Sequence, residues 1–153
     1  MEPRILILGL GNLLMGDEGI GIRCLEYLHH RALPEGIDML DGGTAGFQLL
    51  SLLSEYDHVI FIDATAGEGI PGEVNVLRPR FAADFPRSLT SHDIGLRDLV
   101  KSAELLDELP DIYLITINVR KANQVTIEIS SDLKGSPRKV YDAVRRIIGE
   151  LTG

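Results

Sequence analysis

The stretch of residues 5–21 constrains the fold more than any other part of the chain. It begins with residues 5–8, an apolar run without alternation that is typical of a parallel strand covered on both faces. Gly9 and Gly11 then allow the backbone to turn sharply or to approach a ligand. Helical apolar spacing starts at Ile20. Because ligands of open α/β sheets gather at the carboxyl ends of strands, we expect the functional site at this loop.

The length and composition fit one soluble globular domain. With 153 residues, 44% of them hydrophobic and 25% charged, the chain is long enough to form one core, and we predict a single domain over residues 1–153. The single cysteine, Cys24, excludes an internal disulfide and fits a reducing, cytoplasmic location. It lies on the apolar side of the first predicted helix, where we expect it to pack in the core.

Membrane and nucleic-acid partners are not expected. No apolar run approaches the roughly 20 residues of a membrane span. Residues 1–4 lead directly into the first strand, so we expect no signal peptide. The net charge of −8 argues against wide contact with phosphate backbones, although it does not exclude a protein partner.

The order of the predicted elements indicates a parallel sheet covered by helices. Strand and helix patterns alternate through the first part of the chain, as in β-α-β units. The predicted strands are residues 4–9, 37–40, 59–62, 73–77 and 112–117, and the predicted helices are residues 19–30, 47–53, 94–106 and 136–151.

Two segments depart from this order. The segment between Asp63 and Glu73 is short and rich in glycine, whereas a parallel crossover needs roughly a dozen or more residues. We therefore expect the strand at residues 73–77 to run antiparallel at an edge of the sheet. Residues 125–129 alternate apolar and polar side chains, which favours a further strand that extends or edges the sheet.

The candidate site residues follow the predicted strands. Asp17 and Glu18 come after the first strand, Asp63 follows the third, and His92 precedes a helix. If the first and third strands are neighbours, their acidic residues share one rim of the sheet. Two carboxylates and one imidazole form a mixed oxygen and nitrogen donor set that suits a divalent transition metal.

Each of these residues also has a structural interpretation. Asp17 could cap the first helix, as acidic residues commonly do at helix N-termini. Asp63 could bind nearby loop amides, and His92 could be a polar residue at a helix start, beside Asp93 as a cap. Residues 41–44 form either a tight turn or a backbone surface for an extended peptide. We expect the remaining histidines to lie on the surface or at strand edges: His29, His30 and His58.

A nucleotide site does not fit the glycine-rich loop. Gly9 and Gly11 match the first half of the dinucleotide fingerprint, but its third glycine is replaced by Leu14. Asp17 and Glu18 would also repel a pyrophosphate from the helix end that should bind it. The Gly-Lys-Ser/Thr of a P-loop is missing as well.

Four segments occur together in a specific order over roughly the first hundred residues: 9–21, 41–46, 61–64 and 91–96. Together they resemble the motifs of the hydrogenase maturation proteases. The resemblance implies a cytoplasmic endopeptidase of the aspartic type that trims the C-terminal extension of a [NiFe] hydrogenase large-subunit precursor. Cleavage would follow nickel insertion and let the subunit close around its metal centre.

The resemblance also implies roles for particular residues. The nickel-binding positions of the family fall on Glu18, Asp63 and His92, which makes them the expected metal-binding and catalytic residues. The second motif is implicated in cleavage or substrate recognition, which implies a catalytic Asp41 and a substrate-binding segment of Gly42, Gly43 and Thr44. The nickel would be carried by the precursor, and other divalent metals are expected to be able to occupy the same site.

The fold that this family implies is a three-layer α/β/α sandwich of the phosphorylase/hydrolase-like type. Its five-stranded, mostly parallel twisted sheet has one antiparallel strand, in agreement with the orientation expected for residues 73–77. After Leu114 the chain departs from the family pattern, since residues 116–120 lack the glycine and following proline or glutamate of many members. The departure leaves the identity of the substrate open.

Several mechanisms and functions remain as alternatives. The sequence has neither a His-Glu-x-x-His zinc motif nor a Gly-x-Ser-x-Gly nucleophile elbow, and Cys24 lies in mid-helix. Either a metal polarises the scissile carbonyl, or a carboxylate or the metal activates water. Other candidate functions are a non-catalytic chaperone that checks for nickel, a receiver-like phosphoacceptor domain, and a peptidyl-tRNA hydrolase, which shares the opening Gly-Leu-Gly-Asn.

Overall fold

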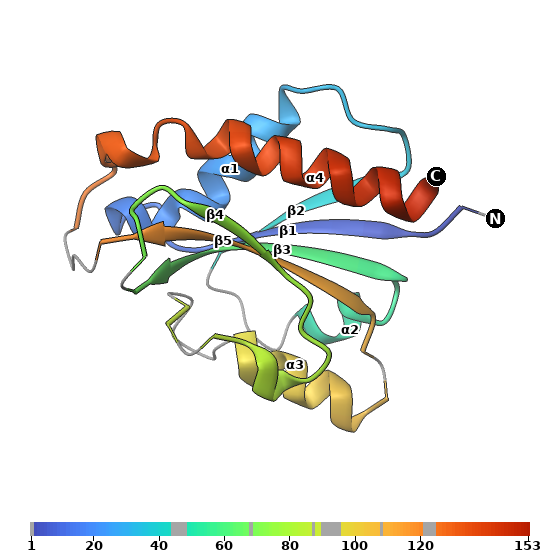
Figure 1. The fold of residues 1–153 in the computed structure, drawn as a ribbon. Coiled ribbons are helices and arrows are strands. Elements are labelled where there is room, and N and C mark those ends of the chain that lie inside the picture. Colours follow the sequence, from blue (N-terminus) through green and yellow to red (C-terminus); the bar gives the residue numbers. More distant parts are fainter. Residues whose placement is uncertain are drawn as a thin grey trace.

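The chain folds into a central sheet between two layers of helices, as predicted. The computed structural model describes residues 2–43, 49–67, 69–86, 88–89, 96–107, 109–120 and 125–153. Helices α1 and α4 cover one face of the sheet, and α2 and α3 lie below the other (Figure 1). The strands are β1 (Ile5–Leu10), β2 (Ile37–Gly43), β3 (His58–Ala66), β4 (Val74–Leu77) and β5 (Asp111–Val119). The α-helices are α1 (Ile20–His29), α2 (Leu50–Leu53), α3 (Leu96–Leu105) and α4 (Ser136–Thr152), and the 3-10 turns are η1 (Gly16–Gly19), η3 (Ala82–Asp84) and η4 (Ser131–Leu133).

The sheet has the strand order β2-β1-β3-β5-β4. β1 pairs with both β2 and β3 in parallel, and β3 pairs with β5 in parallel. β4 pairs with β5 antiparallel and lies at the edge, which confirms the orientation expected from the short preceding segment. The first and third strands are therefore neighbours, and their carboxyl ends share one rim.

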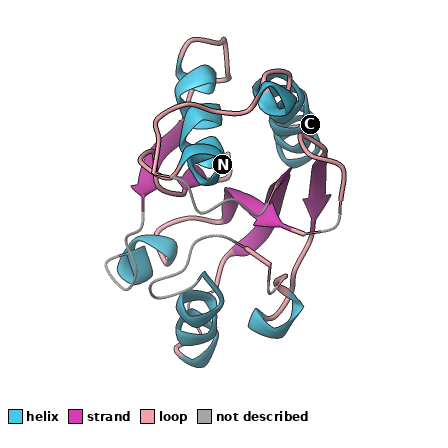
Figure 2. Ribbon diagram, turned by 90° about the vertical axis from the view of Figure 1, so that its left-hand side faces the viewer, coloured by secondary structure: helices cyan, strands magenta, loops and turns pink. Residues whose placement is uncertain are grey.

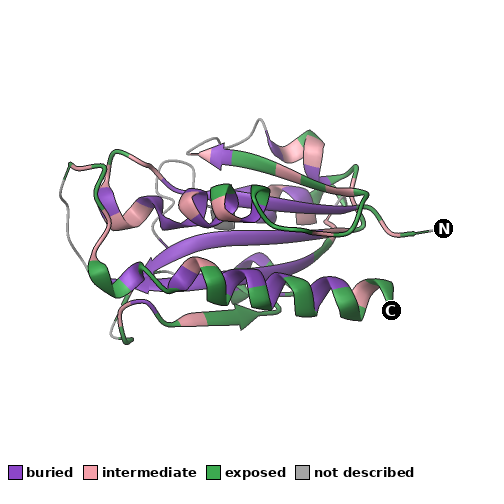
Figure 3. Ribbon diagram, turned by 90° about the horizontal axis from the view of Figure 1, so that it is seen from above, coloured by how far each residue is buried: buried purple, intermediate pink, exposed green. Residues whose placement is uncertain are grey.

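Each face of the sheet carries its own hydrophobic core. Ile5 and Ile7 of β1 pack on the side of α1 and α4, whereas Leu6 and Leu8 pack on the side of α3. The non-alternating apolar run is thus explained by helices on both faces, which Figure 2 shows end-on. In Figure 3, the central strands are coloured as buried, and buried and exposed residues alternate along α4.

The predicted strand at residues 125–129 is wrong. Both edges of the five-stranded sheet are occupied by β2 and β4, and the segment lies over the loop after β1 instead. Thr126 forms an isolated parallel bridge with Met15 there, and the alternating Val125 and Ile127 are 79% and 65% exposed. Alternation here reflects one exposed apolar side of a short extended segment rather than a face of the sheet.

Some predicted boundaries also differ. β3 does not end before Asp63 but continues through it to Ala66, because β5 pairs with it along its whole length. β2 likewise extends to Gly43. Of the helix predicted over residues 47–53, α2 covers Leu50–Leu53, and Phe47 lies outside the described residues. Among the helices of the described ranges, none is long and apolar enough to cross a membrane.

Candidate functional site

Close packing after β1 requires glycine at two positions, one in the loop and one in the first turn of α1. Gly11 has a φ of +134°, and a Cβ atom there would collide with the carbonyl oxygen of Glu18. A Cβ on Gly21, in the first turn of α1, would collide with the carbonyl oxygens of Leu10 and Ile62. The start of α1 therefore lies directly on the backbones of β1 and β3.

This close approach brings together the two segments that carry the sequence-predicted acids. Glu18 lies on η1, three residues before Gly21, and η1 packs beside β3. Asp63 is the residue after Ile62, whose carbonyl oxygen faces Gly21. The glycine contact thus places the turn that carries Glu18 next to the part of β3 that carries Asp63.

Asp63 is a fully buried carboxylate, with 0% of its surface exposed. It is paired in register with Thr116 of β5, and its Oδ1 accepts a hydrogen bond of 2.8 Å from the Ala64 N–H. Burying a carboxylate costs several kcal/mol unless hydrogen bonds or a cation offset the loss of water. A carboxylate kept at this position is a strong candidate for a functional group.

The second motif lies beside the first. Asp41 pairs in register with Gly9, and the Gly11 N–H donates to the Gly43 carbonyl oxygen at 3.1 Å. The Asp41 Oδ1 accepts a hydrogen bond of 2.8 Å from the Gly43 N–H, across Gly42. Asp41, Gly42 and Gly43 therefore continue β2 rather than form the tight turn considered as one alternative, and Asp41 is exposed at its surface.

Asp17 has a role that sequence reasoning missed. Its oxygens accept hydrogen bonds from the Ser130 N–H at 2.7 Å and from the Ser130 hydroxyl at 2.5 Å. Its interpretation as a helix cap is wrong, because these oxygens bind a distant segment rather than helix amides. The two residues are 113 positions apart, and nothing in the local pattern around Ser130 pairs it with an acidic residue.

Two of the predicted site residues and one predicted helix cap have no described position. His92, Asp93 and Thr44 lie outside the described residues. Within the residues that are described, no group of three His, Cys, Asp or Glu side chains could hold a metal ion. Of the predicted nickel-binding set, the structure therefore describes two members, Glu18 and Asp63.

The lone thiol is not a candidate nucleophile. Cys24 is fully buried in α1 against the sheet, as predicted, and burial raises the pKa of its thiol to about 12. Because the thiolate is the nucleophilic form, almost none of it is present at neutral pH. Of the other histidines, His29 and His30 are exposed and His58 lies at the amino end of β3, away from this rim.

Comparisons with known proteins agree with this fold. A sequence profile described as "Hydrogenase maturation protease" matches residues 22–150. The hydrogenase 2 maturation protease of Escherichia coli (strain K12) is 40% identical over 110 residues, which are 70% of this chain and 67% of that protein. HupD of Bradyrhizobium diazoefficiens, a hydrogenase expression/formation protein, is 40% identical over 114 residues, which are 71% of this chain and 58% of that protein.

A solved structure shares almost the whole fold. The hydrogenase maturating endopeptidase HybD from E. coli has a TM-score of 0.85 and 32% identity, and the match covers 96% of this chain and 93% of that one. The fold and these relatives define a class of three-layer α/β endopeptidases. The chain belongs to the hydrogenase maturation protease family. Its match with the two sequence relatives spans about three fifths to two thirds of their own lengths.

Proposed function

We propose that this protein is the endopeptidase that removes the C-terminal extension of a [NiFe] hydrogenase large-subunit precursor after nickel insertion. Family membership supports the reaction class. The observation that carries the proposal is the contact of Gly21 with the carbonyls of Leu10 and Ile62, because it brings the turn of Glu18 to the buried Asp63. The segments that carry these two acids lie toward the carboxyl ends of β1 and β3, where ligands of such sheets gather.

In this proposal the nickel is part of the substrate. Glu18, Asp63 and His92 would bind the nickel that the precursor carries, so that the protease distinguishes a loaded precursor from an empty one. Carboxylate and imidazole donors suit a divalent transition metal. Glu18 is partly exposed and can face an incoming protein, whereas Asp63 is held from within the sheet by the Ala64 amide.

The acids of the site would also serve the aspartic-type cleavage. Hydrolysis of the peptide bond needs a polarised carbonyl and an activated water, and a bound metal or a carboxylate can supply either. Asp41 is exposed at the end of β2, where it can reach a peptide laid along the site. Its carboxylate is oriented by the Gly43 N–H.

The end of β2 supports the proposed recognition of an extended chain. β2 is the first strand in the sheet order, so its outer side faces no other strand of that sheet. An extended peptide can add to such an edge by main-chain hydrogen bonds. Gly42 and Gly43 would let the tail of the precursor approach closely, and Thr44 follows them directly in the sequence.

A processing assay tests this function. The purified protein is mixed with nickel-loaded and nickel-free large-subunit precursors from the same host, and cleavage is read as a mass shift. We expect cleavage of the loaded form alone. Binding of the loaded precursor without cleavage would favour the checkpoint chaperone, and equal cleavage of both forms would contradict the recognition of nickel.

A further inference from the structure

Three aliphatic side chains form an exposed patch at the rim of the candidate site. Leu14, Val125 and Ile127, here called the rim patch, are 61%, 79% and 65% exposed. Single exposed aliphatic residues are common on soluble proteins and need no explanation. These three differ because they come from two segments that are bonded to each other.

The backbones of the two segments are held side by side. The Thr126 N–H donates to the Leu14 carbonyl oxygen at 2.9 Å, and the Gly16 N–H donates to the Thr126 carbonyl oxygen at 2.7 Å. The parallel bridge between Met15 and Thr126 places Leu14 beside Val125. Side chains alternate along extended segments, so the half-buried Met15 and Thr126 face inward and the rim patch faces outward.

Side-chain contacts fix the segment at Ile127 and beyond it at Ser130. The Arg23 Nη2 donates to the Ile127 carbonyl oxygen at 2.7 Å. Three residues further on, the Ser130 N–H and hydroxyl donate to the Asp17 carboxylate. A surface ordered in advance loses little conformational entropy when a partner binds, which favours association.

We propose that the rim patch is the docking surface for the folded body of the precursor, where it contacts an apolar surface next to the nickel centre. This inference rests on the proposed function. The patch is continuous with the candidate site through Met15. This residue forms the bridge to Thr126, and the Met15 carbonyl oxygen accepts a hydrogen bond of 3.2 Å from the Glu18 N–H. A protein that presents nickel to Glu18 would therefore contact the patch as well.

The size of the patch fits a transient client better than a second copy of the chain. Three aliphatic side chains present at most a few hundred Å², whereas each partner of a stable complex buries about 800 Å². A protease has to release its product, so a small apolar contact beside the cleavage site is sufficient. The remaining affinity would come from the precursor's nickel and from its C-terminal tail, bound along the edge of β2.

The test compares a patch variant with a matched control. The triple variant Leu14→Ser, Val125→Thr, Ile127→Thr removes apolar surface from exposed positions. The control Leu105→Ser changes a leucine on the last turn of α3 whose exposed fraction, 79%, equals that of Val125. Binding to nickel-loaded precursor and the concentration dependence of its processing are measured for both variants and for the wild type.

We expect the triple variant to raise both Kd and KM by about tenfold and to keep kcat within about twofold of wild type. Leu105→Ser should leave Kd and KM unchanged. Wild-type Kd and KM in the triple variant would overturn the docking surface. If the wild type binds but does not cleave, the proposed function fails and the Kd of the triple variant still decides about the patch. A wild-type dimer that the triple variant dissociates in sedimentation would assign the patch to self-association and overturn the proposal.

Discussion

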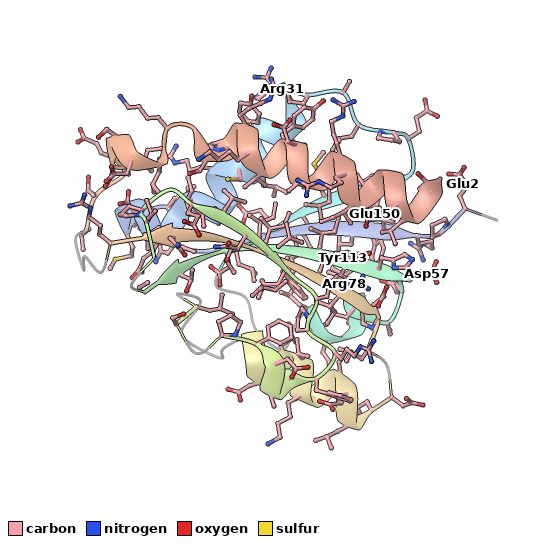
Figure 4. All side chains as sticks on the ribbon, viewed as in Figure 1. Glu2, Arg31, Asp57, Arg78, Tyr113 and Glu150 are labelled. Atoms are coloured by element: carbon pink, nitrogen blue, oxygen red, sulfur yellow. The ribbon has the colours of Figure 1, made fainter. Side chains whose placement is uncertain are left out.

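The parallel strands hold Asp111, at their amino ends, and Asp63, toward their carboxyl ends, in different ways. At the amino ends, the exposed Asp111 lies 3.2 Å from both His58 and Arg78, Arg78 stacks over Tyr113 at 3.9 Å, and the neighbouring Asp57 accepts the Arg4 N–H. Arg78, Tyr113 and Asp57 are labelled at this end in Figure 4. At the carboxyl ends, Asp17, Asp41 and Asp63 accept hydrogen bonds from backbone amides, and Asp17 also from a hydroxyl.

This difference separates surface stabilisation from a preorganised site. Exposed ion pairs contribute little and can rearrange, since water competes for both partners. A buried carboxylate bonded to a backbone amide, such as Asp63, has its position set by the fold itself, which a metal or substrate site requires. We therefore expect changes at the carboxyl ends to affect processing and changes at the amino ends to affect it little.

The largest effect is expected from Glu18. Glu18→Gln keeps the size of the side chain but removes the charge that would bind nickel, so we expect processing of loaded precursor to fall by at least about a thousandfold. Glu26→Gln changes an exposed glutamate of α1 in the same way and should process like the wild type. The rates come from a time course of the mass shift, and wild-type processing by Glu18→Gln would remove this glutamate from the mechanism.

The next effect concerns the glycine that joins α1 to the sheet. Gly21→Ala forces a Cβ against two carbonyl oxygens, and we expect a loss of about 2–4 kcal/mol in the free energy of unfolding. Gly149→Ala, a helical glycine with open space around it, should instead stabilise by up to about 1 kcal/mol. Urea unfolding measures both, and equal effects would show that the close approach at Gly21 is not required.

A smaller effect is expected where the long-range contact of Asp17 is weakened. Ser130→Ala removes the hydroxyl donor but keeps the N–H donor, so we expect the free energy of unfolding to fall by about 1–2 kcal/mol. Amide hydrogen exchange should rise mainly in residues 125–130 and change little in β3 and β5. A uniform rise in exchange across the sheet would mean that the contact supports the whole fold rather than this segment.

The smallest effect is expected at the amino ends. Arg78→Ala removes a half-exposed ion pair and a ring contact. We expect the free energy of unfolding to fall by about 1 kcal/mol or less and processing to stay unchanged. Thermal unfolding and the processing assay measure the two quantities. A processing defect without a loss of stability would show that the amino ends take part in function and would remove the contrast between the two ends.

Local patterns predicted the parts of the fold that depend on neighbouring residues. The apolar run of β1 indicated burial on both faces, and the short glycine-rich segment after β3 indicated an antiparallel β4; both are confirmed. Residues 125–129 were mispredicted because alternation shows only that side chains face two environments, not which backbone lies alongside. The contact of Asp17 with Ser130 depends on the complete fold, and no local signal indicates it.

The candidate site was predictable to the extent that it follows strand ends. Glu18 follows β1 and Asp63 lies in the carboxyl half of the adjacent parallel β3, so topology alone brings their segments toward one rim. How closely they approach depends on the packing of Gly21 against Ile62, which sequence spacing does not indicate. The inclusion of His92 in the site stays a prediction, since this histidine lies outside the described residues.

The most direct test compares the two aspartates at either end of β3. Asp63 is buried at the carboxyl half of the strand, and Asp57 precedes the strand, where its Oδ2 accepts the Arg4 N–H at 2.8 Å. Asparagine keeps an oxygen acceptor at each position, so both variants should fold. With nickel-loaded precursor, we predict that Asp63→Asn loses processing and that Asp57→Asn retains it within about twofold. Full processing by a folded Asp63→Asn would contradict the placement of the site at the carboxyl ends of β1 and β3.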